Sequence, residues 1–486
     1  MPMTKRLEDA LADYAVSRAY PFHMPGHKRR PASCQPAIAA AMSMDITEID
    51  GFDNLHAPQG LLKNEMEFAS RLFGSQETFF SVNGSTGAIL AAISAAAPFG
   101  SKILIERRCH ISVYHAAYLR NLKLQYIDER LREQIELPSA RDRLGAAGRT
   151  DLAAVVITSP SYEGFVKKVS AWADYAHSIG AVLIVDEAHG AHFSMHPYFP
   201  PSAIHCGADL VVQSLHKTLP ALTQTALLHR VTDRVGGHEL RRFLTVYETS
   251  SPSYLLMASI TGCLHEMAEK GQDYFSAYAN RLQALRKNLA ESLQCLRLEG
   301  NGPEYDPGKI LITAPAPCTG ADLYRILRET YQLQPEMHGE DYVLLMTSVA
   351  DTEEGFARLT KALSEIDAEL QQAGRQAEIP SEAAPVGSAG RSPGYREQPG
   401  ASRCPFGSDF IPPAAMRLSI AADAPRELLP LQEAEGRISA DYILIYPPDS
   451  PLVVPGEVFT KETLEMLRRR LGPETSGRKV AVVSRS

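Results

Sequence analysis

Between about residue 64 and residue 250, short apolar runs alternate with helical stretches, and this alternation constrains the fold more than any other feature of the sequence. The runs are rich in β-branched residues and apolar at every position: Ile103–Ile105, Ala154–Ile157, Val182–Val185 and Leu210–Val212. Strands that are apolar on both faces are typical of a parallel sheet buried beneath helices. We therefore predict an α/β architecture with a mainly parallel sheet in the major domain.

Composition divides the rest of the chain. At 486 residues it is too long for one compact core. Residues 1–60 are rich in Pro, His and Gly, whereas a stretch rich in Pro, Gly, Ser and Ala begins near residue 371, and neither has clear apolar periodicity. We expect an N-terminal arm (1–60), a major domain that contains the predicted sheet (61–300), a small α+β domain (301–372), a flexible linker (373–410) and a C-terminal domain (411–486).

Finer elements are also expected in two of these regions. Two prolines favour an extended conformation for Pro21–Lys28 in the arm. In the small domain the pattern predicts strands at 310–313 and 342–347 and helices at 321–331 and 352–373.

Charge and cysteine content restrict the class of protein. A formal net charge of −8 argues against a nucleic-acid partner, which calls for a basic face. No apolar window has the length that crosses a membrane, and the N-terminus lacks the apolar core of a signal peptide. The 7 cysteines are odd in number and include no CxxC pair, which indicates reduced thiols in a cytoplasmic protein.

Two charged residues stand where strands of the predicted sheet end. Asp186 ends the run Val182–Val185, and Lys217 follows Leu210–Val212. Ligands of open α/β sheets bind at the carboxyl ends of the strands, so these side chains are expected to converge. Together they offer what pyridoxal 5'-phosphate (PLP) requires: a lysine that forms a Schiff base and a carboxylate that keeps the pyridine nitrogen protonated. A solvated surface lysine is the alternative interpretation of Lys217.

A glycine-rich turn could hold the phosphate of this cofactor. Asn83–Gly87 precedes an Ala/Ile-rich helix whose free N–H groups would face an anion. Gly84 allows the backbone to approach closely, and Ser85 and Thr86 add hydroxyl donors. A turn of this composition is often only a helix N-cap, so the signal gains weight from the lysine downstream.

Three further side chains could contact the cofactor. Ser214 and His216 flank Lys217 and offer a hydroxyl and an imidazole to the phosphate. His110 follows the strand expected at 102–106 and could stack on the ring. A structural histidine is the alternative interpretation of His110.

Two competing motifs need to be weighed. Asp186–His189 also matches a helicase box, which acts on Mg-ATP bound by an upstream GxxxxGK[ST] loop. The nearest candidate loop, Gly302–Lys309, lies downstream with the wrong spacing. The histidines at 189, 192 and 196 suggest a metal site, but a glycine and a proline break the helix that such spacing requires. We therefore expect neither a helicase nor a metal centre.

Short motifs of one kind of protein extend along nearly the whole chain. They are Phe22–His27, Asp45–Glu48, Asp53–Leu55, Asn83–Gly87, Cys109–His110, Asp186–His192, Ser214–Thr218, Gly436–Ile438, Tyr446–Pro448 and Pro455–Glu457. In combination they resemble the Orn/Lys/Arg decarboxylases, in a short form without the N-terminal wing domain. The resemblance implies the PLP-dependent fold type I, which is similar to aspartate aminotransferase.

The resemblance also implies a role for each candidate residue. The catalytic residues would be Lys217, Asp186, His189 and His110, with His189 beside the cofactor. The cofactor-binding residues would be Gly84, Ser85, Thr86, His110, Asp186, Ser214, His216 and Lys217. The implied reaction is decarboxylation of a basic amino acid to a polyamine-pathway amine, with arginine favoured over lysine and ornithine. The implied assembly is a homodimer with active sites at the interface, to which the arm contributes.

The sequence departs from the family pattern at Ile111, Leu215, Glu163 and Asp449, none of which is a core catalytic group. Two alternatives follow. One is another fold type I enzyme, such as an aminotransferase or β-lyase. The other is a regulatory paralogue that binds PLP or a partner without turnover.

Overall fold

The computed structural model describes residues 5–17, 24–25, 28, 36–136, 151–377, 410–445, 450–475 and 477–485. Most of the Pro21–Lys28 segment lies outside these ranges, as does the expected linker from residue 378 to residue 409. The Tyr446–Pro448 motif and Asp449 also lie outside the described residues.

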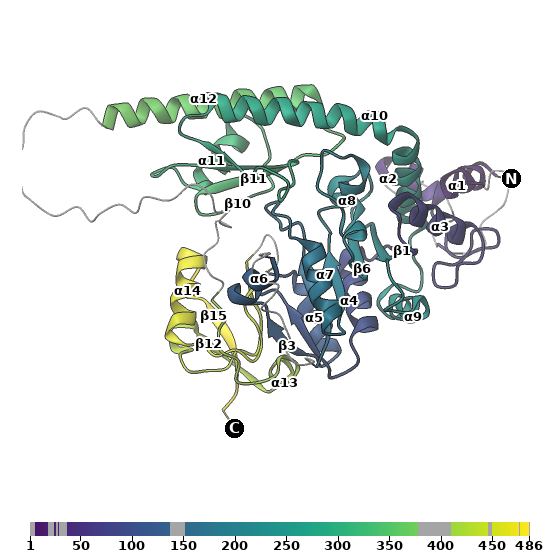
Figure 1. Cartoon of the computed structure of the whole chain (residues 1–486), viewed down its shortest axis with the longest axis horizontal. Coiled ribbons are helices and arrows are strands. Elements are labelled where there is room, and N and C mark those ends of the chain that lie inside the picture. Colours follow the sequence, from purple (N-terminus) through teal and green to yellow (C-terminus); the bar gives the residue numbers. More distant parts are fainter. Residues whose placement is uncertain are drawn as a thin grey trace, which may run out of the picture.

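A seven-stranded sheet forms the centre of the molecule (Figure 1). In spatial order its strands are β1 (Glu77–Ser81), β7 (Ala226–Arg230), β6 (Leu210–Ser214), β5 (Val182–Asp186), β4 (Leu152–Thr158), β2 (Lys102–Ile105) and β3 (Lys123–Tyr126). Strand β7 is antiparallel to β1 and to β6, whereas the pairs from β6 to β3 are all parallel. The sheet is therefore mainly parallel, as the apolar runs predict.

Helices cover both faces of this sheet, which explains why its inner strands are apolar throughout. In β5, Leu183 and Val185 face one core, whereas Val182 and Ile184 face the other. The first core includes residues from α3 (Leu61–Phe73), α6 (Glu129–Glu136), α7 (Val169–Ser178) and α10 (Tyr254–Ser292). The second includes residues from α4 (Gly84–Ala96), α5 (Ile111–Leu119) and α9 (Gly237–Tyr247).

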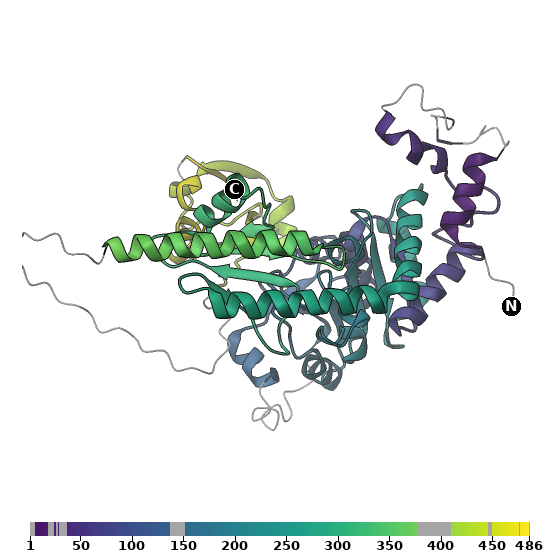
Figure 2. The same cartoon turned by 90° about the horizontal axis from the view of Figure 1, so that it is seen from above.

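A smaller antiparallel sheet lies beyond the central one. Its strands, in spatial order, are β10 (Met337–His338), β11 (Tyr342–Met346), β9 (Lys309–Thr313) and β8 (Arg297–Glu299). It packs with α11 (Gly320–Glu329), α12 (Glu353–Ala377) and the distal part of α10. Figure 2 shows α10 and α12 side by side along this part of the molecule. At 39 residues, α10 is about 58 Å long.

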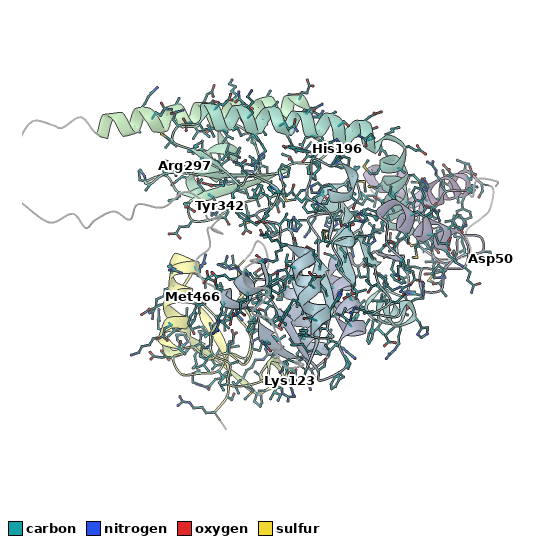
Figure 3. The ribbon with its side chains drawn as sticks, viewed as in Figure 1. Asp50, Lys123, His196, Arg297, Tyr342 and Met466 are labelled. Atoms are coloured by element: carbon teal, nitrogen blue, oxygen red, sulfur yellow. The ribbon has the colours of Figure 1, made fainter. Side chains whose placement is uncertain are left out.

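The C-terminal unit has a core of its own around Phe459 and Leu467. Its elements are α13 (Leu418–Asp423), β12 (Arg426–Pro430), β13 (Ile443–Ile445), β14 (Ser450–Val453), α14 (Lys461–Leu471) and β15 (Lys479–Val483). This unit also has two short 3-10 helices, η5 (Leu431–Glu433) and η6 (Gly472–Thr475). Two others, η3 (Phe193–Met195) and η4 (Ala203–His205), lie between β5 and β6 in the chain. Figure 3 labels Met466 on α14 and Tyr342 on the small sheet, which mark these two parts of the molecule.

A buried ion pair joins the C-terminal unit to the central sheet. Arg107, just past β2, donates to both carboxylate oxygens of Glu457, at 2.6 and 2.9 Å. The same guanidinium donates to the Leu452 carbonyl (2.7 Å) and to the Tyr126 hydroxyl (3.0 Å). Both charged side chains are almost fully buried, and each is matched by its partner. The Pro455–Glu457 motif thus has a structural role in docking this unit.

Part of the N-terminal arm is helical. Helix α1 (Leu7–Val16) buries Leu7 and Leu11 and packs against α10, where Thr261 Oγ1 donates to Glu8 at 2.8 Å. Helix α2 (Pro36–Met44) follows. Within the described residues, no helix is both long and apolar enough to cross a membrane.

Candidate active site

The expected site residues come together at one edge of the central sheet. Strands β1, β2, β4, β5 and β6 run in the same direction, because β1 and β6 are each antiparallel to β7. Their carboxyl ends therefore share one edge, and each candidate follows one of these ends. Gly84, Ser85 and Thr86 follow β1, and His110 follows β2. Asp186 is the last residue of β5, and His189 follows it. Ser214 is the last residue of β6, and His216 and Lys217 follow it.

Lys217 lies in α8 (Leu215–Thr218), a single turn that begins directly after β6. Its Nζ lies 3.1 Å from His189 Nε2. Within the described chain, no carboxylate oxygen lies within ion-pair distance of this Nζ. Burial lowers the pKa of Lys217 below its ordinary value, although Asp186 and Glu336 act in the opposite direction. The amine is therefore biased toward the neutral form, which is the nucleophile.

The adjacent carboxylates Asp186 and Glu187 face opposite sides of the sheet, as the alternation of a strand requires. Asp186 is 4 % exposed, and its Oδ1 accepts a hydrogen bond from Ala188 N at 3.1 Å. Glu187 accepts from the Ser202 hydroxyl (2.6 Å) and from Gln213 Nε2 (2.7 Å), and burial raises its pKa to about 7. Glu187 thus belongs to a buried structural network, whereas Asp186 remains available to a cationic ligand atom.

Two buried hydroxyls flank Lys217 in the sequence and lack a hydrogen-bond partner among the described residues. Ser214 Oγ and Thr218 Oγ1 have no hydrogen-bond partner within the part of the chain that the structure describes. Buried hydroxyls in this state are costly, and the oxygens of a phosphate would satisfy them. Thr218 is a candidate that sequence reasoning misses, although it lies in the same motif as the lysine.

The glycine-rich turn has the geometry of an anion site. Gly84 has a φ of +70°, which suits glycine, and its N–H donates to the Gln224 carbonyl at 3.0 Å. Ser85 and Thr86 occupy the first turn of α4, where backbone N–H groups lack helical partners. The bond to Gln224 ties this turn to the loop that follows Lys217.

The two flanking histidines are held by short-range contacts. His110 is the N-cap of α5, and its Nδ1 accepts from Ser112 N (3.2 Å) and lies 2.8 Å from the Ser112 hydroxyl. His216 Nδ1 lies 3.0 Å from the Thr225 carbonyl, to which it donates. With the proton on Nδ1, Nε2 could donate to an anion only in the imidazolium form, which burial disfavours by lowering the pKa of His216 and which a nearby phosphate would favour.

Lys309 is a second lysine of the site, and it is one that sequence reasoning misses. It is the first residue of β9 in the small sheet, is 1 % exposed, and places Nζ 2.8 Å from His189 Nδ1. Burial lowers its pKa to about 8. The signal in the sequence is a lysine directly before the apolar run Ile310–Ile312. The same lysine also ends the stretch Gly302–Lys309, which resembles a phosphate-binding loop.

Tyr162 and Glu336 complete this side of the site. The Tyr162 ring contacts His189 edge-on, with ring centroids 4.7 Å apart, and lies 5.4 Å from Lys309 Nζ. The Tyr162 hydroxyl donates to Glu336, an exposed residue just before β10. The small sheet therefore contributes both Lys309 and Glu336 to a site that is built mainly on the central sheet.

The histidines of the apparent metal motif have separate partners. His189 contacts the two lysines, His192 Nε2 lies 3.2 Å from buried Asp306, and His196 Nδ1 accepts from Tyr198 N. Across the described residues, no group of three or more His, Cys, Asp or Glu side chains could hold a metal ion.

The residues present fit PLP. The site offers a partly buried amine with a lowered pKa, a buried carboxylate at a neighbouring strand end, and two unsatisfied hydroxyls in the same motif as the lysine. Together with the mainly parallel sheet, these features define a PLP-dependent enzyme of fold type I.

Comparisons with known proteins give the family. The model of the Orn/Lys/Arg decarboxylase major domain matches residues 5–305, and that of the C-terminal domain of the same family matches residues 411–469. The chain belongs to the Orn/Lys/Arg decarboxylase family, as its motifs predict.

Individual relatives match over most of their length. An arginine decarboxylase of Bacillus subtilis is 30% identical, with 97% of this chain and 96% of the relative covered. An arginine decarboxylase of Halalkalibacterium halodurans is 31% identical, with 92% and 89% covered. The structure of the constitutive lysine decarboxylase of E. coli superposes with a TM-score of 0.76 at 19% identity, covering 98% of this chain and 82% of that one, so it shows the fold.

Proposed function

We propose that this chain decarboxylates a basic amino acid, and that the amino acid is arginine. The observation that carries the proposal is the pairing of Lys217, a partly buried amine without a carboxylate within ion-pair distance in the described chain, with Asp186 at the next strand end. Membership of the decarboxylase family supports the reaction. Arginine is supported by relatives of that name that match over nearly the whole chain.

When bound, PLP supplies an electron sink for the electron pair that remains on Cα as carbon dioxide departs. Lys217 holds the cofactor, and its lowered pKa favours the neutral amine that this bond requires. Asp186 would face the pyridine nitrogen of the bound cofactor and hold a proton there. His110, fixed as the N-cap of α5, would stack on the cofactor ring. The proton that replaces carbon dioxide on Cα comes from His189 or Lys217, whose nitrogens lie 3.1 Å apart.

The phosphate is held by groups from two strand ends. Gly84, Ser85 and Thr86 present the first turn of α4. Ser214 and His216 contribute from β6 and α8, and the buried Thr218 hydroxyl joins them. The unsatisfied hydroxyls support this part of the proposal, because they would otherwise stay desolvated without a partner.

The active unit in this proposal is a cytoplasmic homodimer of chains with the five regions expected from the sequence. Leu222, in the loop after Lys217, is 54% exposed, and Val246 on α9 is 63% exposed, so a second copy could cover apolar surface near the site. The described cysteines, Cys109, Cys206, Cys263, Cys295 and Cys318, are free thiols, as in a reducing compartment.

The test is to incubate the purified protein with PLP and arginine, lysine or ornithine, and to identify the amine by mass spectrometry. Agmatine from arginine is the expected product, with Lys217→Ala as the inactive control. A spectral change that depends on a keto acid would indicate an aminotransferase instead. Cofactor absorbance without any amine would indicate a binding paralogue, and analytical ultracentrifugation would test the dimer.

A further inference from the structure

One imidazole lies between two lysines at the heart of the site. His189 Nε2 lies 3.1 Å from Lys217 Nζ, and His189 Nδ1 lies 2.8 Å from Lys309 Nζ. Lys217 comes from the central sheet and Lys309 from the small sheet, so the three groups form one line across both. Lys309 has no role in the proposed chemistry so far, although its charged end is completely enclosed.

The hydrogen bonds of this line restrict its protonation. A neutral imidazole has one N–H and one lone pair, whereas an ammonium group can only donate. Two ammonium groups cannot both donate to neutral His189, because one ring nitrogen already carries a hydrogen. Protonating the ring would leave both its nitrogens as donors facing two cations. One of the two lysines must therefore be a neutral amine when both bonds form.

The surroundings and the proposed function together assign the proton to one of the two lysines. Buried Asp306 accepts from Gly308 N at 2.9 Å and favours the charged form of Lys309, and the face of Tyr162 lies 5.4 Å from Lys309 Nζ. For Lys217, Asp186 and Glu336 act in the same direction. The Schiff base that the proposed function assigns to Lys217 forms from the neutral amine, so we assign Lys309 as the ammonium and Lys217 as the amine.

We propose that Lys309 is a positioning residue that donates to His189 Nδ1, fixes this histidine as the neutral Nε2–H tautomer, and thereby holds Lys217 as the hydrogen-bond-accepting free amine. The choice of Lys217 as the amine rests on the proposed function. Once that choice is made, the tautomer of His189 follows from the two hydrogen bonds.

The charge around His189 supports the same conclusion. Burial lowers the pKa of His189 well below its ordinary value, and the next largest contribution comes from Lys309. The groups that face the ring are Lys309 from β9, Lys217 and His216 from α8, His110 before α5, and Tyr162 after β4. Asp186 and Glu336 face the lysines rather than the ring.

The direct test is nitrogen NMR of the apoprotein with labelled histidine. The ring nitrogen shifts distinguish a protonated nitrogen from an unprotonated one, and His189→Gln assigns the signal among the 15 histidines. At pH 7 the wild type should show protonated Nε2 and bare Nδ1. Lys309→Met keeps an unbranched stem but removes the donor, so the two tautomers should mix and the ring should titrate at a higher pH.

The matched control is Lys167→Met. Lys167 is also a largely buried lysine, but it pairs with Glu106 at 2.8 Å instead of a histidine. This variant should leave the His189 signal unchanged. If Lys309→Met does not fold, a wild-type titration replaces it: discharge of Lys309 near pH 8 should begin to mix the tautomers.

In the loaded enzyme, Lys309→Met should lower kcat about tenfold to a hundredfold, with KM nearly constant and the acid limb of the pH profile moved to higher pH. His189 shifts and titration that are the same in Lys309→Met and wild type would overturn the proposal, as would a wild-type ring with bare Nε2 at pH 7. Because the NMR experiment needs no turnover, absence of decarboxylation would count against the proposed function alone.

Discussion

Two clusters of charged side chains in this molecule differ in whether each charge has an oppositely charged partner. At the junction with the C-terminal unit, Arg107 meets Glu457 through two hydrogen bonds, and its remaining donors reach a carbonyl and a hydroxyl. At the edge of the central sheet, Lys217 and Lys309 share one histidine, and no carboxylate of the described residues lies within ion-pair distance of either. The matched pair can hold two units together. The unmatched lysines instead have lowered pKa values, which suits chemistry at neutral pH.

The substitution Lys217→Ala should have the largest effect on activity. Activity should fall by roughly three to six orders of magnitude, because no other group can replace the covalent step. The thermal midpoint should not fall, since the change removes a buried amine that lacks a counterion. Rate assays and thermal unfolding measure the two effects. Borohydride reduction of the wild type with PLP should place the adduct on Lys217, and an adduct on another lysine would refute its role.

Asp186→Asn should keep the cofactor bound but lower kcat about a hundredfold to a thousandfold, because an amide cannot hold the pyridine nitrogen protonated. The adjacent carboxylate gives a matched control. Glu187→Gln alters the network with Ser202 and Gln213 on the opposite face, so it should change stability more than rate. A near-normal rate in Asp186→Asn would mean that Asp186 does not face the ring nitrogen.

At the junction between the C-terminal unit and the central sheet, substitutions should lower stability more than activity. Arg107→Met leaves Glu457 buried without its partner, which should cost about 3–5 kcal/mol in urea unfolding. Arg107→Met combined with Glu457→Met should recover much of this loss, because no charge is then stranded. The folded fraction of each variant should retain wild-type kcat. A rate loss that exceeds the folded fraction would show that this pair serves the active site as well.

The effect that is smallest at neutral pH concerns a buried group without net charge. The ring of His229 lies between Thr78 Oγ1, 2.9 Å from its Nδ1, and Gln213 Oε1, 3.1 Å from its Nε2. Burial lowers the pKa of this histidine to about 3. The unfolded chain binds a proton near pH 6.5 and the folded chain does not, so stability is lost as the pH falls below 6.5 toward 3. The stability difference between wild type and His229→Gln should shift by about 1.4 kcal/mol per pH unit over that range. A pH-independent difference would show that His229 accepts a proton in the fold.

The sequence predicts those parts of the structure that local patterns encode. The run Val182–Val185 lies within β5, and the strand expected at 342–347 corresponds to β11 (Tyr342–Met346), because apolar periodicity is a local property. Helix α1 has a weak pattern and is stabilised by burying Leu7 and Leu11 against other helices, so local sequence does not reveal it.

The candidate site divides in the same way. Residues that end strands of one sheet, such as Asp186 and Lys217, can be placed together by topology alone. Lys309 reaches His189 only because the small sheet docks against the central one, and Arg107 and Glu457 are 350 positions apart in the chain. Such contacts depend on how separate units pack, which no spacing rule contains.

Helix α10 gives the molecule a mechanical property. Near its start Thr261 and His265 are bonded to Glu8 and Glu65, and farther along Arg286 donates to the carbonyl of Lys309 at 3.2 Å. A continuous helix about 58 Å long resists bending because every turn is hydrogen-bonded. It therefore connects the N-terminal helices α1 and α3 to the strand that carries Lys309 through a single stiff element.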